Sequence, residues 1–231
     1  RTIVAIGSHD LVLDLAASAL RAEDPLITLA SSNVGSLGGL VALRDGLCHI
    51  AGSHLLDPAT GEYTLPYVDK LLGKEIVVIR LVHRDQGLIV APGNPLDLSK
   101  IDDLTRPGLR YVNRQRGAGT RALLDHELAQ RGIAPTDVPG YTREEHTHLA
   151  VAAAISADRA DAGLGILAAA RPFDLDFVPV AQEPYDLVLR ADSLTDDRLA
   201  PLWTLLDRGD FRDKVEALGG YSCAETGRRI R

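Results

Sequence analysis

Four short segments of the sequence combine small, hydroxylated and polar residues in a way that suits the binding of an anion. Each follows a predicted strand and stands where a helix should begin. The first backbone N–H groups of a helix have no partner within the helix, and this end of the helix carries part of a positive charge. Ser and Thr at such positions also cap helices, and for Ser8 or Ser36 alone capping is the simpler interpretation. The four segments are Gly7-Ser8, residues 32–36, residues 113–120 and Glu145-His146-Thr147.

The segment from residue 113 to residue 121 is the most distinctive of the four, with the sequence Asn-Arg-Gln-Arg-Gly-Ala-Gly-Thr-Arg. We expect Arg114 to reach a bound anion, because it stands at the end of a predicted strand. Gly119 allows close approach of the backbone, and Gly119 and Thr120 can donate N–H and O–H groups. The spacing of a phosphate-binding P-loop is absent, as is a dinucleotide-binding Gly-x-Gly-x-x-Gly after the first strand. Alternatively, each arginine of the segment faces solvent and pairs with an acid such as Asp125.

Two histidines of the fourth segment, His146 and His148, stand two residues apart and cannot lie on one face of a helix. No third Cys, His or acidic residue has a metal-finger spacing to them, so the sequence predicts no zinc site and no cofactor. His146 is expected to face the anion as a hydrogen-bond donor, and Glu145 could supply an acceptor. Because paired carboxylates and a Ser-His-Asp order are also absent, we expect a binding domain and not an enzyme.

The anion-binding segments must be positioned by strands and helices, and these alternate along the chain. The alternation predicts an α/β fold with a parallel sheet and right-handed crossovers. In such a sheet the turns after the strands meet at the carboxyl edge, where ligands of open α/β folds bind. The expected strands cover residues 2–6, 26–30, 48–52, 75–82, 87–91, 109–113, 160–164, 176–180 and 185–190, and the expected helices residues 11–20, 37–43, 65–72, 100–104, 117–131, 145–157, 166–171 and 199–218.

The order of these elements predicts two lobes. The polar residues 83–86 interrupt a β-rich region, and Pro184 marks a second place where the chain crosses between lobes. We therefore expect residues 1–84 and 183–231 to form lobe I and residues 85–182 to form lobe II, with the ligand cleft between them. A length of 231 residues suits this division, because each lobe then has about 100 residues, a usual domain size.

Charge and hydropathy exclude several classes of protein. The formal net charge of −7 and the lack of a basic cluster argue against direct nucleic acid binding by this segment. No apolar run reaches the roughly 18 residues of a membrane-spanning helix, so we expect no membrane partner. The sequence begins at Arg1, which leaves open whether a signal peptide or a DNA-binding domain precedes it. We expect a cytoplasmic location, or a periplasmic or extracellular one if a leader was removed.

Long strings of the sequence resemble a known family, the PBP-like domain that occurs beside helix-turn-helix domains and molybdopterin-biosynthesis modules. The strings cover nearly the whole chain and comprise residues 7–11, 35–40, 49–57, 86–95, 113–121, 140–141 and 144–148. The resemblance implies a two-lobed, type II periplasmic-binding-protein-like α/β fold that closes on a small ligand. It also implies an oxyanion such as molybdate or tungstate, because the family is similar to proteins that bind these ions.

The same resemblance implies which residues contact the ion. In the molybdate- and tungstate-binding relatives, a serine after the first strand and a hydroxyl or N–H at the second helix contact the oxyanion. These two positions correspond to Ser8 and Ser36. The tungstate-binding group also has an arginine six residues before the threonine of a Gly-Thr pair, which Arg114 and Thr120 match. His54, His146 and His148 are not shared by these relatives.

The leading functional hypothesis is a sensor that reports molybdate or tungstate by lobe closure to a fused or partner helix-turn-helix DNA-binding domain. A domain or enzyme of molybdenum-cofactor biosynthesis and the extracellular receptor of an oxyanion ABC transporter are the alternatives. A site composed of donors suits a fully ionised dianion, whereas the proton of hydrogen phosphate needs an acceptor. If Glu145 supplied such an acceptor, the site would no longer prefer molybdate or tungstate over hydrogen phosphate.

Overall fold

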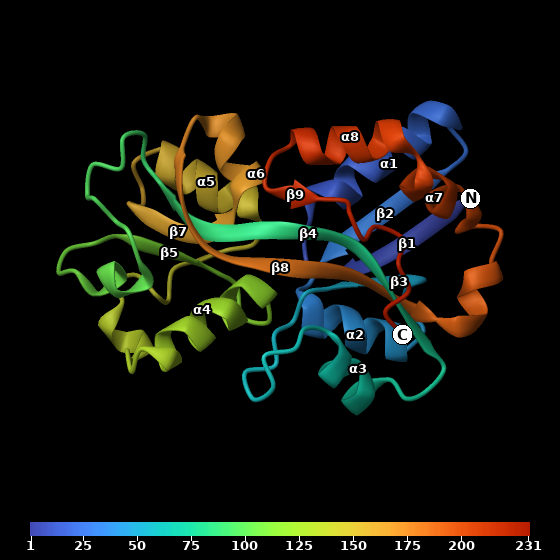
Figure 1. The fold of residues 1–231 in the computed structure, drawn as a ribbon, viewed down its shortest axis with the longest axis horizontal. Coiled ribbons are helices and arrows are strands. Elements are labelled where there is room, and N and C mark those ends of the chain that lie inside the picture. The colour runs from blue at the N-terminus through green and yellow to red at the C-terminus, as the bar shows by residue number, and fades with distance from the viewer. The chain divides into compact units, whose positions relative to one another are not determined.

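The computed structural model describes residues 1–231 and divides them into two compact units. Unit 1 comprises Arg1–His83 and Pro184–Arg231, and unit 2 comprises Arg84–Glu183. The chain passes from one unit to the other along two long strands, β4 (Ile76–Val90) and β8 (Asp176–Arg190) (Figure 1). That the two units act as lobes that close on a ligand stays a prediction.

Unit 1 is built on parallel strands whose carboxyl ends lie together. Its elements, besides parts of β4 and β8, are β1 (Thr2–Gly7), α1 (Leu11–Glu23), β2 (Thr28–Asn33), α2 (Ser36–Arg44), β3 (Ile50–Ser53), α3 (Leu65–Leu71), the 3₁₀ helix η4 (Ala191–Thr195), α7 (Ala200–Asp207), α8 (Gly209–Ala217) and β9 (Tyr221–Ser222). Strand β1 pairs in parallel with β2 and β3, and β3 pairs antiparallel with β8. Gly7 lies opposite Asn33 of β2 and Gly52 of β3, so the three parallel strands end at one edge.

Helix α2 packs tightly against the end of β1. A Cβ atom added to Gly39 would lie 2.6 Å from the Ile6 carbonyl oxygen and from the Gly7 Cα, so a larger residue does not fit there. Beneath the helix, apolar side chains from α2, α3, β3, β4 and β8 form a buried cluster that comprises Leu40, Leu43, Ala51, Val68, Ile76, Val78 and Val188. This packing holds the first residue of α2, Ser36, at the carboxyl edge of the strands.

Unit 2 repeats the parallel arrangement on a second set of strands. Its elements, besides parts of β4 and β8, are η1 (Ile101–Thr105), β5 (Tyr111–Arg114), α4 (Gly119–Gln130), η2 (Pro135–Asp137), β6 (Glu144–Glu145), α5 (His148–Ser156), β7 (Ala162–Ile166), α6 (Leu167–Ala170) and η3 (Arg171–Phe173). Strand β5 pairs in parallel with β6 and β7, and β7 pairs antiparallel with β4. No helix in the chain combines the length and the apolar character needed to cross a membrane.

The long strands β4 and β8 correct three expectations from the sequence. Residues 75–82 and 87–91 were expected to be two strands with a polar break, but they belong to the single strand β4. Residues 176–180 and 185–190 likewise belong to the single strand β8. The sheet is mixed and not wholly parallel, because β8 and β4 run antiparallel to β3 and β7. Polar residues continue β4 because the side chains of Arg84 and Gln86 find buried partners, while those of His83 and Asp85 stay partly exposed.

The start of α5 is a further correction. The expected helix began at Glu145, whereas α5 begins at His148. Glu144 and Glu145 pair instead with Asn113 and Arg114 as strand β6. Thr147 is the N-cap of α5, and its hydroxyl oxygen accepts a hydrogen bond from the Ala150 N–H at 3.0 Å.

Candidate anion-binding site

Arg114, at the end of β5, is a buried arginine and is only 1% exposed. Its Nη2 donates to the His146 carbonyl oxygen at 3.0 Å, and its Nε lies 3.3 Å from the Glu145 carbonyl oxygen and 3.2 Å from Gln115 Oε1. Its Nη1 is buried and has no hydrogen-bond partner. The alternative interpretation, in which Arg114 faces solvent, is therefore wrong, and one of its strong donors remains available for a ligand.

A second buried arginine, Arg84, forms an ion pair with Glu183 in the same unit. Its Nε donates to Glu183 Oε1 at 2.8 Å, and its Nη2 lies 2.7 Å from the same oxygen. Both side chains are completely buried. Burial and the nearby charge of Arg84 lower the pKa of Arg114 from its usual range to about 9, with a smaller opposite effect from Glu183. Arg114 therefore remains protonated at neutral pH, and two buried guanidinium groups lie near the Glu183 carboxylate.

Gln86 connects this charged cluster to Thr120 of helix α4. Its Nε2 donates to Glu183 Oε1 at 2.7 Å and to Thr120 Oγ1 at 2.9 Å. Because the Thr120 oxygen accepts this bond, its own O–H proton can be donated to another group. No side chain caps the N-terminus of α4, which begins at Gly119. The donors at this end of the helix are therefore not used by a capping residue.

Ser8 and Ser36 of unit 1 are brought together by His54. Ser8 Oγ lies 2.7 Å from His54 Nε2, and the backbone N–H of His54 donates to Ser36 Oγ at 3.2 Å. The Tyr185 hydroxyl donates to the Ser8 carbonyl oxygen at 2.6 Å, and its ring stacks on the His54 ring with centroids 5.7 Å apart. All four side chains are buried.

Neither serine caps a helix. Asp10 is the N-cap of α1, and its Oδ1 accepts from the Val12 N–H at 2.8 Å. Gly35 is the N-cap of α2 and no side chain caps that helix. The capping interpretation is thus wrong for Ser8 and Ser36, whereas it describes Thr147 correctly.

The segment from Glu145 to Thr147 contributes backbone atoms to Arg114. The carbonyl oxygens of Glu145 and His146 accept hydrogen bonds from its side chain, and the pairing of β6 with β5 places them next to Arg114. The His146 side chain is exposed and that of Glu145 is partly buried. A ligand contact by these side chains stays a prediction.

The other arginines of this segment have separate positions. Arg121 is 5% exposed, forms an ion pair with Glu144 and lies over the Tyr141 ring at 4.4 Å, so it supports the local fold. Arg116 is exposed, as the solvent-facing interpretation predicts.

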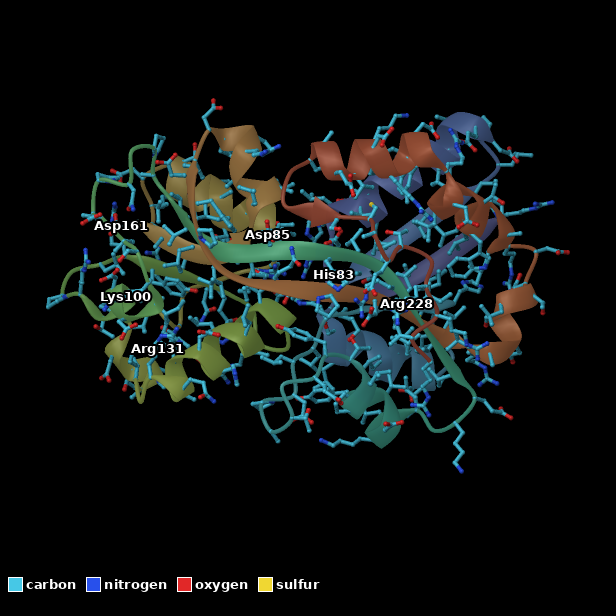
Figure 2. All side chains as sticks on the ribbon, viewed as in Figure 1. His83, Asp85, Lys100, Arg131, Asp161 and Arg228 are labelled. Carbon is cyan, nitrogen blue, oxygen red and sulfur yellow. The ribbon has the colours of Figure 1, made fainter.

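Arg84 and Gln86 are site residues that the sequence reasoning missed. Along β4 the partly exposed His83 and Asp85, labelled in Figure 2, alternate with the buried Arg84 and Gln86. This alternation with a period of two is typical of a strand, but it lies in the burial of the side chains and not in their types, because all four residues are polar. The prediction that they form a polar break between two strands depended on composition alone.

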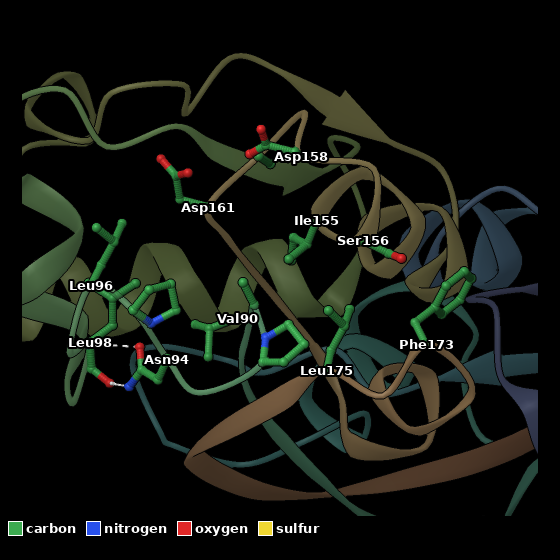
Figure 3. Close-up of a pocket in the computed structure, with 14 residues that line it drawn as sticks. Val90, Asn94, Leu96, Leu98, Ile155, Ser156, Asp158, Asp161, Phe173 and Leu175 are labelled. Atoms are coloured by element: carbon green, nitrogen blue, oxygen red, sulfur yellow. Dashed lines mark hydrogen bonds between the residues drawn. The ribbon is translucent and has the colours of Figure 1, made fainter.

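A separate apolar hollow of about 390 Å³ lies elsewhere in unit 2 (Figure 3). Its walls include Val90, Ile155, Phe173 and Leu175, and none of the predicted site residues lines it. At one side of it, Asp158 and Asp161 both pair with Arg110. An apolar hollow with paired acids does not suit an anion.

Comparison with known proteins gives the family. The model of the PBP superfamily domain matches residues 17–207. A relative from Bacillus subtilis (strain 168), the uncharacterized protein YvgK, is 35% identical over 234 residues, which cover 100% of this chain and 74% of that protein. These sequence matches establish the family, and the similarity to solved structures establishes the fold.

Two solved structures illustrate that fold. A proposed phosphate ABC transporter substrate-binding protein from Clostridium perfringens, with bound phosphate, has a TM-score of 0.70 at 13% identity and covers 94% of this chain and 98% of its own. The regulatory domain of a LysR family regulator from N. meningitidis has a TM-score of 0.59 at 14% identity and covers 96% and 99%. The chain therefore has a type II periplasmic-binding-protein-like α/β fold and belongs to the PBP superfamily domain family.

Proposed function

We propose that the chain is a binding domain for a small tetrahedral oxyanion and that it performs no catalysis. The observation that carries this proposal is the charge of the buried arginine cluster in unit 2, where the guanidinium groups of Arg84 and Arg114 both lie near the Glu183 carboxylate. A buried charge without a counter-charge is unfavourable, and a bound anion offsets that effect. Arg114 Nη1 is the donor that such an anion would accept from first.

Hydroxyl and backbone groups supply the further donors in this proposal. Thr120 Oγ1 accepts from Gln86 and Ser36 Oγ accepts from the His54 N–H, so both hydroxyl protons are left for a ligand. The proposed contacts are Ser8, Ser36, Arg114, Gly119, Thr120, Glu145, His146 and Thr147.

The identity of the ion is the finer part of the proposal. The sequence resemblance supports molybdate or tungstate, while the C. perfringens structure contains phosphate. All three are tetrahedral oxyanions, and the positive charge of the cluster supports any of them. Which of these ions binds most tightly therefore depends on individual hydrogen bonds in the site.

Isothermal titration of the protein with molybdate, tungstate and phosphate, with and without the substitution Arg114→Ala, tests the proposal. We expect Arg114→Ala to weaken binding by about 1.5–3 kcal/mol, the range for a hydrogen bond to a charged group. The matched control is Arg116→Ala, which removes an exposed arginine two residues away and should leave the affinity unchanged. Equal affinity of both variants, or no binding of any oxyanion by the unsubstituted protein, would refute the proposed function.

A fused or partner helix-turn-helix DNA-binding domain is the proposed recipient of the signal. The regulatory domain of a LysR family regulator shares the fold, and so does full-length CbnR, which was solved in complex with its target DNA. A receptor function for transport is the second possibility, which the phosphate-transport neighbours support. In either case we propose that ion binding changes the arrangement of the two units. DNA-binding assays on the full-length protein with and without the ion separate the two: an ion-dependent change in DNA affinity supports regulation.

A further inference from the structure

The orientation of the Gln86 side-chain amide is determined by its neighbours. Gln86 is completely buried, and its Nε2 lies 2.7 Å from Glu183 Oε1 and 2.9 Å from Thr120 Oγ1. The Glu183 carboxylate, which also pairs with Arg84, accepts hydrogen bonds and cannot donate them while it is ionised. The amide nitrogen, and not the oxygen, must therefore face Glu183.

This orientation leaves the amide oxygen, Gln86 Oε1, buried and without a hydrogen-bond partner. A buried acceptor without a partner is unfavourable, and most such groups in native proteins are satisfied. The same cluster contains the unpartnered donor Arg114 Nη1. A ligand that satisfies both atoms must accept one hydrogen bond and donate another.

We propose that Gln86 Oε1 accepts a hydrogen bond from the bound ion, and that the site therefore prefers an oxyanion that keeps a proton at neutral pH. This inference rests on the proposed oxyanion-binding function. Hydrogen phosphate and hydrogen arsenate carry such a proton. Sulfate, selenate, molybdate and tungstate are fully ionised and would leave the Gln86 oxygen unsatisfied.

The inference reverses the preference expected from the sequence. That expectation assumed a cluster composed of donors, in which the proton of hydrogen phosphate has no acceptor unless Glu145 provides one. Gln86 provides an acceptor, which was missed because residues 83–86 were expected to be a polar break between two strands. The preference for molybdate or tungstate then loses its physical basis.

Two pairs of ions of similar size separate the effect of the proton from the effect of size. Phosphate is compared with sulfate, and arsenate with selenate, by isothermal titration at pH 7 and constant ionic strength. We expect each protonated ion to bind about tenfold more tightly, or better, than its fully ionised partner. Molybdate and tungstate should bind more weakly than arsenate.

The substitution Gln86→Met assigns the preference to this residue. Methionine has a similar length and offers no strong acceptor, so the phosphate-to-sulfate affinity ratio should fall about tenfold. The control Gln182→Met replaces an exposed glutamine whose amide donates to Asp85, and should keep the ratio. Each ratio is formed from two affinities of the same variant, so a loss of affinity that affects both ions equally does not change it.

Three results overturn the inference: sulfate or selenate binding as tightly as its protonated partner, molybdate or tungstate binding best, or an unchanged ratio in Gln86→Met. If Gln86→Met does not fold, the comparison of the unsubstituted protein with the two ion pairs still decides. Failure of all six ions to bind would instead refute the proposed function.

Discussion

The substitution Glu183→Gln removes the negative charge of the buried cluster with almost no change in shape. In the unsubstituted protein, Glu183 Oε1 is the partner of Arg84 and of Gln86 Nε2. The substitution therefore removes the negative charge that pairs with Arg84 and that lies near Arg114. Breaking a buried pair in this way costs about 3–5 kcal/mol, and a value near 3 is expected here because glutamine keeps one acceptor for Arg84. Total stabilities are about 5–15 kcal/mol, so the variant should still fold.

Urea denaturation with and without phosphate measures both consequences of this substitution. Without ligand, we expect the free energy of unfolding to fall by about 3 kcal/mol. With phosphate, we expect a larger stabilisation than in the unsubstituted protein, because the variant has one negative charge fewer beside the bound anion. The control Asp192→Asn removes an exposed partner of Arg190 and should change stability by less than about 1 kcal/mol. A Glu183→Gln variant that is as stable as the control, or that gains no more from phosphate than the unsubstituted protein, would show that the cluster has no excess positive charge.

Three further predictions concern other parts of the chain. Ser8→Ala should weaken oxyanion binding by about 0.5–1.5 kcal/mol in the titration, the net value of a typical hydrogen bond, and unchanged affinity would remove Ser8 from the site. Gly39→Ala places a Cβ 2.6 Å from the Ile6 oxygen and should destabilise the protein by about 1–3 kcal/mol in urea, whereas Gly209→Ala, with open space around it, should not. The Arg198 side chain lowers the pKa of Asp196 from 3.8 to about 2, so this pair stabilises the fold above pH 4 and loses that effect as the pH falls towards 2. Stability measured across that pH range should therefore fall less steeply in Asp196→Asn, and identical slopes would contradict the assignment.

The local parts of the fold were predictable from the sequence. The β-branched run at the start of the chain, the turn at Gly7 and the amphipathic pattern that follows correspond to β1 and α1 within a few residues. The turns that hold Ser8 and Ser36 were also found, because small hydroxylated residues between a strand and a helix are a local signal. Such signals depend on residues that are close in sequence.

The partners that complete the site are distant in sequence, and local patterns do not contain them. Arg84 and its partner Glu183 are 99 positions apart, and Ser8 and His54 are 46 positions apart. Without Glu183, a run of four polar residues in β4 has the composition of a loop. The position of Gln86 in a buried strand, and therefore its unsatisfied oxygen, follows from the tertiary pairing alone.

A crystal structure of the protein soaked in arsenate tests the central claim most directly, because anomalous scattering locates arsenic without ambiguity. The account predicts an arsenic peak with its oxygens in hydrogen-bond contact with Arg114 Nη1 and Thr120 Oγ1. A peak elsewhere, such as in the hollow between Val90 and Phe173, or no peak at an arsenate concentration that saturates binding in solution, would contradict it.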